Sequence, residues 1–255
     1  MKTNFGFKKV DFAEKARLVN DVFSSVSAKY DVMNDVMSLG VQRLWKKKFV
    51  EGLDIKNDDK VLDLASGTGD IAFAIRKNYP YSHIIVSDVN EDMLNIAKEK
   101  ALEKGLYQNL EFKIINAEKI PLKDESLDLA TISFGIRNVA NIPQALQEVN
   151  RVLKAGGKFY IMEFSKMLEG EEGYKKYLGK FYEFYSMNIL PKLGKVIAKD
   201  EDSYRYLAES IKTFPDAEEF KTMLEEAGFH NVSYEKLIGE GVAIHRAEKA
   251  AEKDE

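Results

Sequence analysis

Two acidic side chains flank a glycine-rich segment, and their spacing suits a positively charged ligand. Asp63 lies in a short apolar run, and Gly67-Thr68-Gly69 follows this run closely. Asp70 comes next and begins a segment with helical spacing. Glycines after a first strand permit a tight turn and let a ligand approach the backbone. Because opposite charges attract strongly in a partly buried cleft, the two carboxylates indicate a cationic ligand.

Two classes of cofactor fit the glycine segment when it is considered alone. Residues 67–72 also match the G-x-G-x-x-A pattern of dinucleotide sites. A pyrophosphate, however, binds bare N–H groups at a helix N-terminus, where a carboxylate would repel it. S-adenosylmethionine (SAM) carries an ammonium and a sulfonium, so Asp63 and Asp70 favour SAM over a nicotinamide cofactor. The alternative for Asp70 is a helix-start carboxylate that interacts only with the helix dipole.

Other candidate ligands stand at the ends of three later apolar runs. Asp88 ends the second run, where an acid can accept hydrogen bonds from both ribose hydroxyls, although a role as N-cap or turn residue is also common. Asn116 and Ala117 follow the third run and would border the adenine, and Ser133 ends the fourth. Open α/β sheets bind ligands at the carboxyl ends of their parallel strands, so this joint placement predicts one cofactor site.

The elements that must position these residues alternate from residue 60 onward. Apolar runs predict strands, and helical spacing predicts helices between them: strands at 61–64, 83–87, 110–115, 127–133 and 158–163, helices at 70–78, 90–105 and 142–153. A helix at 216–227, with Gly228 as C-cap, precedes a closing pair of strands at 232–237 and 241–246. We therefore expect an α/β, Rossmann-like fold: a mostly parallel seven-stranded sheet, helices on both faces and an antiparallel edge.

Three segments fall outside this alternation. Residues 1–50 predict an N-terminal helical lid, in which a loop at 30–34 interrupts the helices. Within the α/β domain, residues 51–246, an aromatic-rich helical insertion is expected at 168–212. Residues 247–255 are strongly charged and predict a disordered tail.

The composition excludes several other chemistries. The 255 residues, 45% of them hydrophobic, allow a sizeable core, and the absence of cysteine excludes disulfides and thiolate chemistry. The three histidines are scattered without metal-ligand spacing, so no metal site is expected. A net charge of -4 gives no global basic bias toward nucleic acid. Without a signal-peptide pattern or an apolar run long enough to span a bilayer, we expect a cytoplasmic protein, at most peripheral at the inner face of the membrane.

Several stretches have the form of family signatures. They are Tyr30–Asn34 with Met37, Ser38 and Trp45, then Leu64–Asp70, Ile132–Asn138, Arg151–Gly157 through Glu163–Ser165, and Asp202–Ile211. In these stretches the chain resembles the ubiquinone/menaquinone biosynthesis C-methyltransferase (UbiE/MenG) family of class I SAM-dependent methyltransferases. The resemblance implies methyl transfer from SAM to a ring carbon of a polyprenylated quinol, namely demethylmenaquinol, 2-methoxy-6-polyprenyl-1,4-benzoquinol, or both.

The resemblance also assigns residues. The resemblance implies SAM contacts at Thr68, Asp88, Asn116, Ala117 and Ser133. The loop residues Gly67 and Gly69 are added to these contacts on physical grounds. The expected catalytic residues are Arg137, Tyr30 and Asn138. Arg137 would stabilise a developing phenolate or orient a water; alternatively, it forms an ion pair with a carboxylate such as Asp70. Tyr30 and Asn138 would bind the quinol oxygen, or else hold the lid and shape a turn. His245 is expected to be structural.

Two positions depart from the family pattern. Gln42 stands where the N-terminal signature usually has histidine, and Ala155 stands where the second signature usually has proline. A glutamine can replace one hydrogen bond of a neutral imidazole, so we expect Gln42 to be structural. If that histidine were essential, the chain would instead be a catalytically silent SAM-binding subunit. Another small phenolic or lipid substrate, and an NAD-dependent dehydrogenase, are further alternatives.

Residues 174–199 combine six aromatic side chains and several large apolar ones with six lysines and one glutamate. A basic amphipathic helix can lie on an anionic membrane surface, which would give access to a polyprenyl tail. The alternative is that the aromatic residues pack on the sheet and the lysines are solvated. A homodimer and a quinone-biosynthesis complex are both open as assemblies.

Overall fold

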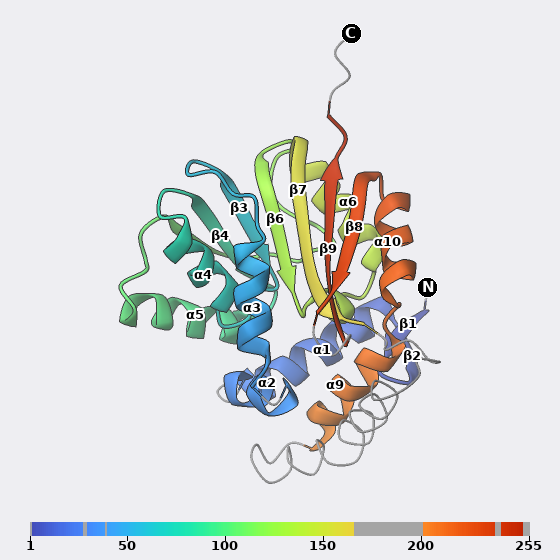
Figure 1. The fold of residues 1–255 in the computed structure, drawn as a ribbon. Coiled ribbons are helices and arrows are strands. Elements are labelled where there is room, and N and C mark those ends of the chain that lie inside the picture. Colours follow the sequence, from blue (N-terminus) through green and yellow to red (C-terminus); the bar gives the residue numbers. More distant parts are fainter. Residues whose placement is uncertain (1, 28–29, 39, 166–200, 238–240, 252–255) are drawn as a thin grey trace, which may run out of the picture.

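One seven-stranded sheet forms the centre of the protein in a computed structural model that describes residues 2–27, 30–38, 40–165, 201–237 and 241–251 (Figure 1). Its strands are β3 (Lys60–Leu64), β4 (His83–Asp88), β5 (Leu110–Ile114), β6 (Leu127–Ser133), β7 (Leu153–Phe164), β8 (Phe229–Lys236) and β9 (Val242–Lys249). They lie in the order β5-β4-β3-β6-β7-β9-β8. All pairings from β5 to β7 are parallel, whereas β9 is antiparallel to both of its neighbours. The predicted fold is confirmed, and the reversed strand is β9, beside the edge strand β8.

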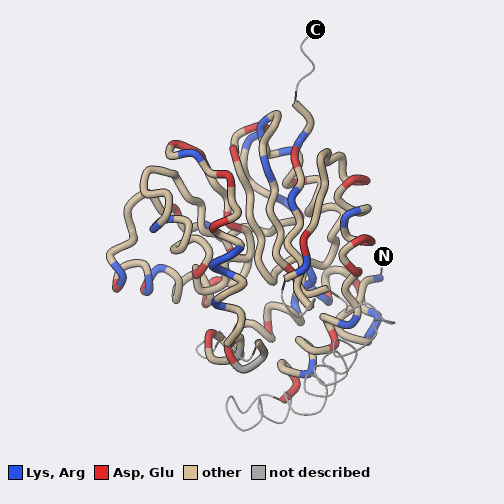
Figure 2. The backbone as a smooth tube through the Cα atoms, in the orientation of Figure 1, with Lys and Arg blue, Asp and Glu red and all other residues tan. Residues whose placement is uncertain are grey.

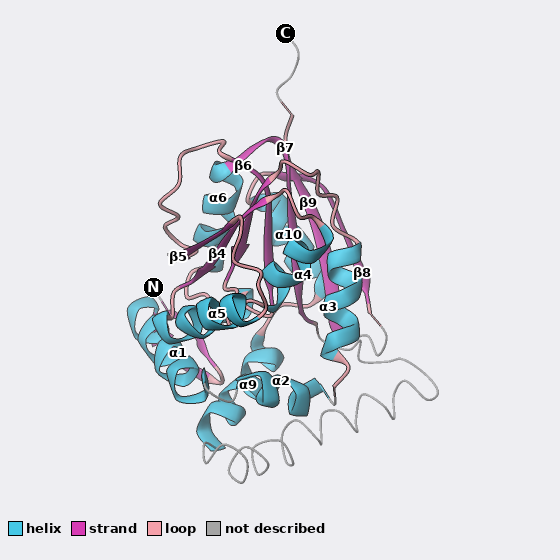
Figure 3. Cartoon of the chain, turned by 90° about the vertical axis from the view of Figure 1, so that its left-hand side faces the viewer, coloured by secondary structure: helices cyan, strands magenta, loops and turns pink. Residues whose placement is uncertain are grey.

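Helices cover both faces of the sheet (Figure 3). The helices α3 (Gln42–Glu51), α4 (Asp70–Asn78) and α5 (Glu91–Glu103) pack into one hydrophobic cluster, and α6 (Ile142–Val152) and α10 (Ala217–Glu226) pack into a second. Alternate residues of β3 enter opposite clusters: Val61 enters the first, Leu62 and Leu64 the second. A strand projects successive side chains to opposite faces, so a continuous apolar run is suited to a strand that is covered on both sides.

Short polar residues start the helices that follow the strands. Asn90 and Asn141 accept hydrogen bonds from backbone N–H groups in the first turns of α5 and α6. Asp216 and Glu219 form a reciprocal capping box at the start of α10. Gly228 has a φ of +90° directly after α10, as expected for a glycine that ends a helix. These local signals explain why the helix boundaries lie close to those expected from the sequence, whereas β7 and β8 begin five and three residues earlier than expected.

The N-terminal segment lies at the end of the sheet where the parallel strands finish (Figure 1). A hairpin of β1 (Lys2–Phe5) and β2 (Lys8–Asp11), which the sequence did not indicate, precedes α1 (Phe12–Val26) and α2 (Tyr30–Ser38). The expected loop at 30–34 is wrong, because these residues begin α2. In the same region, α9 (Glu201–Thr213) packs against α1 through Val19, Val26 and Leu207.

Two expected segments differ from, or extend beyond, the described structure. Strand β9 continues to Lys249, and Ala247 pairs with Phe159 and is 1% exposed, so the predicted tail is wrong for residues 247–249. The insertion is helical over α9, whereas residues 174–199 lie outside the described residues. Basic and acidic positions are interspersed along the described chain (Figure 2). No helix in this described part is long and apolar enough to cross a membrane.

Candidate active site

The glycine segment forms a tight loop between β3 and α4. Gly67 and Gly69 have φ values of +54° and +88°, in the left-handed region that favours glycine. A Cβ atom at Gly69 would lie 2.6 Å from the Phe73 ring, and one at Gly67 would lie 3.2 Å from Tyr30. The Gly67 N–H donates to Asp88 Oδ2 at 2.8 Å, which ties the loop to the end of β4. Glycine is therefore favoured at both positions, because another residue would have a strained backbone and its Cβ atom would crowd a neighbouring ring.

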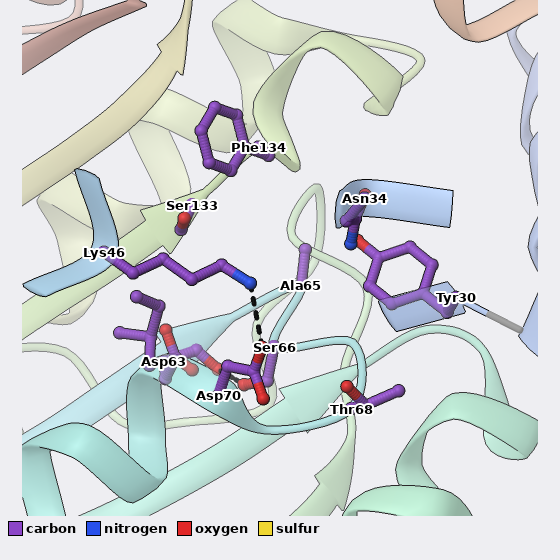
Figure 4. Close-up of a pocket in the computed structure, with 11 residues that line it drawn as sticks. Tyr30, Asn34, Lys46, Asp63, Ala65, Ser66, Thr68, Asp70, Ser133 and Phe134 are labelled. Atoms are coloured by element: carbon purple, nitrogen blue, oxygen red, sulfur yellow. Dashed lines mark hydrogen bonds and ion pairs between the residues drawn. The ribbon is translucent and has the colours of Figure 1, made fainter. Parts of the chain in front are cut away.

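A pocket opens between this loop, the end of β6 and the lid helices α2 and α3 (Figure 4). Polar, charged and aromatic side chains line it: Tyr30, Asn34, Lys46, Asp63, Ala65, Ser66, Thr68, Asp70, Ile71, Ser133 and Phe134. Four of the predicted cofactor ligands, Asp63, Thr68, Asp70 and Ser133, are among them. The structure thus brings together four predicted ligands that are up to 70 positions apart in the sequence, from Asp63 to Ser133.

Asp63 is the most deeply buried carboxylate of the pocket. Its side chain is almost fully buried, and Oδ1 accepts a hydrogen bond from Thr131 Oγ1 at 2.7 Å. Oδ2 is buried and has no hydrogen-bond partner among the described residues. Burial raises the pKa of Asp63 to about 6, although the Thr131 and Ser66 hydroxyls and the Ala72 N–H oppose this effect. A buried carboxylate oxygen without a partner is costly, and a cationic ligand would relieve that cost.

Two more predicted ligands lie at strand ends; Ser133 lines the pocket, whereas Asp88 is outside the lining residues and contacts the glycine loop. Ser133, at the end of β6, has a buried Oγ without a hydrogen-bond partner in the described part of the chain. Asp88, at the end of β4, accepts from the backbone N–H groups of Gly67 and Asn90 at 2.8 and 2.9 Å. Burial raises the pKa of Asp88, while these N–H donors lower it. Each carboxylate oxygen has a second lone pair, so Asp88 retains acceptor capacity for a ligand.

Asp70 forms an ion pair across the pocket. Lys46 Nζ, from α3, lies 2.8 Å from Asp70 Oδ2 at the start of α4 (Figure 4). Burial opposes ionisation of Asp70, but Lys46, together with the charges of Lys100 and Lys104, outweighs it and holds the pKa of Asp70 below its ordinary value. The Lys46 side chain is 17% exposed. Lys46 was not identified from the sequence; its only signal was a cation next to Trp45 in the N-terminal signature.

The lid helix α2 contacts the glycine loop directly. Asp31 Oδ1 accepts a hydrogen bond from Thr68 Oγ1 at 2.8 Å, and Asp31 Oδ2 lies 2.5 Å from Lys100 of α5. Burial raises the pKa of Tyr30, so its phenol is protonated at neutral pH. Among the predicted catalytic residues, Tyr30 is therefore the one that lines the pocket, and it can act there as a hydrogen-bond donor.

Arg137 does not line the pocket, and the alternative partner suggested for it, Asp70, is wrong. Its Nη1 lies 2.7 Å from Glu163 Oε1 of β7, and both side chains are at most 5% exposed. Nη1 also donates to the Phe134 carbonyl at 2.6 Å, and Nε donates to Ser210 Oγ at 3.3 Å. The guanidinium is therefore buried and engaged through Nη1 and Nε, and it holds the loop that carries Phe134.

The remaining predicted ligands lie away from this pocket. Asn138, on the short 3-10 helix η2 (Ile136–Asn138), accepts a hydrogen bond from the Tyr206 hydroxyl at 2.9 Å and shapes the turn. Asn116 accepts from the Glu118 N–H at 2.8 Å in a turn after β5, and Ala117 packs against the core. This turn follows β5, and β4 separates β5 from β3 in the sheet. The turn is therefore two strands away from the strand that precedes the glycine loop.

Gln42 and His245 have structural contacts. Gln42 Nε2 donates to Asp35 Oδ1 at 2.8 Å, between α3 and α2. The Nε2 atom of His245 lies 2.8 Å from the Ala217 carbonyl oxygen, and burial lowers the pKa of His245 to about 4. Neither residue lines the pocket, in agreement with the structural roles expected from the sequence.

Solved structures with this arrangement define the class of protein. A SAM-dependent methyltransferase from Thermotoga maritima, described as a possible histamine N-methyltransferase, matches with a TM-score of 0.63 and 20% identity, over 91% of this chain and 99% of that one. A SAM-dependent methyltransferase from Aquifex aeolicus matches with a TM-score of 0.57 and 20% identity, over 80% and 88%. The fold is that of a class I SAM-dependent methyltransferase.

Sequence relatives define the family within that class. The model of the ubiE/COQ5 methyltransferase family matches residues 9–249, and the chain belongs to this family. The ubiquinone/menaquinone biosynthesis C-methyltransferase UbiE of Rickettsia rickettsii (strain Sheila Smith) is 50% identical over 250 residues, which are 96% of this chain and 98% of that one. The protein with the same description from Rickettsia prowazekii (strain Madrid E) is 49% identical over 251 residues, 97% and 98% of the two chains.

Proposed function

We propose that the protein binds SAM in the pocket beside the glycine loop and transfers its methyl group to a ring carbon of a polyprenylated quinol. The observation that carries the cofactor assignment is the unpartnered Oδ2 of Asp63, buried in the pocket wall. A nicotinamide dinucleotide offers no cation to this carboxylate at the loop, whereas the methionine part of SAM has an ammonium. The residues present therefore fit SAM.

The acidic residues and the glycines around the loop each have a role toward the cofactor. Asp63 and Asp70 face the pocket with negative charge, and Asp88 holds spare acceptor capacity for ribose hydroxyls. Gly67 and Gly69 keep the backbone of the loop free of side chains. When bound, SAM supplies an electrophilic methyl group, so the protein has to position an acceptor and does not have to activate the donor.

Two aromatic side chains, Phe134 and Tyr30, line the pocket, and Phe134 is backed by further rings outside it. Phe134 packs against Phe164 with ring centroids 4.8 Å apart, and Trp45 packs against both. Tyr30 stands on the opposite wall with its protonated phenol, which donates a hydrogen bond to a ring oxygen and cannot take a ring proton. Apolar walls with a few polar groups suit a flat aromatic acceptor.

The substrate class follows from family membership together with this geometry. Relatives of about 50% identity over nearly the whole chain are described as ubiquinone/menaquinone biosynthesis C-methyltransferases. The candidate acceptors are demethylmenaquinol and 2-methoxy-6-polyprenyl-1,4-benzoquinol. Another small phenol or lipid is the alternative, and a silent SAM-binding subunit is disfavoured because Gln42 contacts Asp35 instead of lining the pocket.

The assay that tests the function uses methyl-labelled SAM with short-chain forms of both quinols and mass analysis of the products. We expect label in the ring of at least one quinol. The absence of label from both, in a folded protein that binds SAM, contradicts the quinol assignment; failure to bind SAM contradicts the cofactor assignment as well.

Membrane contact through residues 174–199 is a separate part of the proposal and is based on the sequence alone. The six lysines among aromatic residues would hold the protein at an anionic surface, where the polyprenyl tail is buried. Charge reversal of Lys175, Lys176 and Lys180 to Glu is expected to weaken binding to anionic liposomes. Unchanged binding of the triple variant contradicts membrane contact through this segment.

A further inference from the structure

A lysine of the lid lines the pocket in which an acceptor would lie. Lys46 lines the pocket together with two carboxylates, Asp63 and Asp70. Among the lining residues that the structure describes, it is the one positive charge. Near the end of β6, Arg137 contacts Glu163, the Phe134 carbonyl and Ser210, and Lys15 contacts the carbonyls of Arg137 and Val139; neither cation lines the pocket. The pocket therefore has one lysine that can meet negative charge on a ligand.

We infer that Lys46 is a catalytic residue that stabilises the ionised ring oxygen of the acceptor, an inference that rests on the proposed function. A quinol becomes nucleophilic at carbon when its hydroxyl ionises. Beside two carboxylates that ionisation is disfavoured, because like charges raise the pKa of an acid. An ammonium in a partly buried site reverses this effect.

The position of Lys46 allows the change of partner that this role needs. Its Nζ sits on a flexible four-carbon stem, and its present partner Asp70 faces the same pocket. The positive charges of a bound SAM would compete with Lys46 for Asp70 and would repel the Lys46 ammonium. Asp63 on β3 and Tyr30 on α2 line the same pocket as Lys46. The charge of Lys46 also acts to lower the pKa of Tyr30 and that of Asp35 on α2.

The reaction balances as follows in atoms and charge. The acceptor hydroxyl loses its proton to water, and the oxygen is held as a phenolate by Lys46. The ring carbon forms the new bond to the methyl carbon while the methyl–sulfur bond breaks, and the electron pair of that bond remains on sulfur. The ring proton then leaves to water and the oxygen regains a proton, so one proton is released per methyl transferred.

Three variants separate this role from a structural one. Lys46→Met removes the charge, and Lys46→Arg keeps it. Lys47→Met is the matched control, because Lys47 is the next residue on α3, is 72% exposed and pairs with Glu51. We expect Lys46→Met to lower kcat by about 10²–10³-fold, the range for loss of one electrostatic donor, with the KM for SAM changed far less. Lys46→Arg is expected to restore part of kcat, and Lys47→Met to behave as wild type.

A binding measurement reports on the phenolate itself. With S-adenosylhomocysteine bound, 1-naphthol occupies the acceptor site without reacting, and the ultraviolet absorbance of its phenolate is followed against pH. We expect the bound fraction that is ionised at a given pH to fall about tenfold or more in Lys46→Met, as for loss of an opposite charge nearby. The same titration in Lys47→Met is expected to match wild type.

Several results overturn the inference. Full kcat in Lys46→Met, or an unchanged naphthol titration, shows that Lys46 does not stabilise the phenolate. Recovery of kcat in Lys46→Met/Asp70→Asn shows that Lys46 only neutralises Asp70. A wild-type protein that methylates no quinol contradicts the proposed function, and the role of Lys46 falls with it; an active wild type with an active Lys46→Met variant contradicts the inference alone.

Discussion

Two charged clusters lie at the carboxyl ends of neighbouring strands and differ in one respect. Around Asp63, at the end of β3, a buried oxygen lacks a partner in the described residues, and Ser133 beside it likewise has a free hydroxyl. Around Arg137, close to the end of β6, Glu163 and Ser210 pair with the guanidinium, which also donates to a backbone carbonyl. The first cluster is open and the second is closed. Charge and burial alone therefore do not mark a binding site; unsatisfied hydrogen-bonding capacity in a pocket does.

Breaking the closed cluster is expected to have the largest effect. Glu163→Gln leaves the buried Arg137 without a compensating charge, so the free energy of unfolding should fall by about 3–5 kcal/mol in urea titrations. Removal of both charges in Arg137→Met/Glu163→Met should recover most of this loss. The control is Glu235→Gln, whose carboxylate pairs with Lys48 and Arg246 at the surface and contributes less than about 1 kcal/mol. A Glu163→Gln variant as stable as the control would show that the cluster does not hold the fold.

The open cluster should instead make the fold less stable as pH rises. Asp63 has a pKa of about 6 in the folded protein and 3.8 as its ordinary value, so between these values the folded protein binds the extra proton. The free energy of unfolding of the wild type should fall as pH rises through this window. The free energy of unfolding of Asp63→Asn should therefore increase relative to the wild type by up to about 3 kcal/mol. Urea titrations at intervals across the window measure this difference. Parallel profiles for wild type and Asp63→Asn would contradict the assignment, and the exposed Asp58→Asn serves as the control.

The same substitution should weaken cofactor binding. Asp63→Asn removes the charge that attracts the ammonium, and a hydrogen bond to a charged group contributes about 1.5–3 kcal/mol, or roughly 10–100-fold in Kd. In the wild type, affinity for SAM should decrease as pH falls below about 6, the pKa of Asp63, because the protonated carboxyl no longer attracts the cation. Isothermal titration calorimetry with SAM checks both statements. If Asp63→Asn binds SAM as tightly as wild type at neutral pH, the ammonium lies elsewhere.

Two serines provide the smallest and most closely matched comparison. Ser133→Ala removes a hydroxyl without a partner in the described structure, so stability should be nearly unchanged while SAM affinity falls by up to about tenfold. Ser210→Ala removes a hydroxyl that bonds to Arg137 and to the Leu207 carbonyl, so stability should fall by about 1 kcal/mol with SAM affinity unchanged. Thermal melts and calorimetry on both variants suffice. The opposite pattern would reverse the distinction between open and closed clusters.

The sequence by itself determined the alternation of strands and helices, the turn at the glycines and four of the polar residues that line the pocket. These features depend on local periodicity, capping and the left-handed backbone that glycine permits. Asp63, Thr68, Asp70 and Ser133 were predicted as ligands and line one pocket, because the carboxyl ends of parallel strands meet at the same edge of a sheet.

Only the tertiary structure decided which charged side chains pair with one another. Residues 30–34, with their turn-like composition, form the start of α2 because Asp31 and Tyr30 dock on the glycine loop, and such packing overrides weak local propensity. The partner of Arg137 is Glu163 on β7 instead of Asp70, and Asp70 pairs with Lys46 of the lid. The choice of ionic partner depends on distances between elements that meet only after folding, and the sequence pattern contains no such distances.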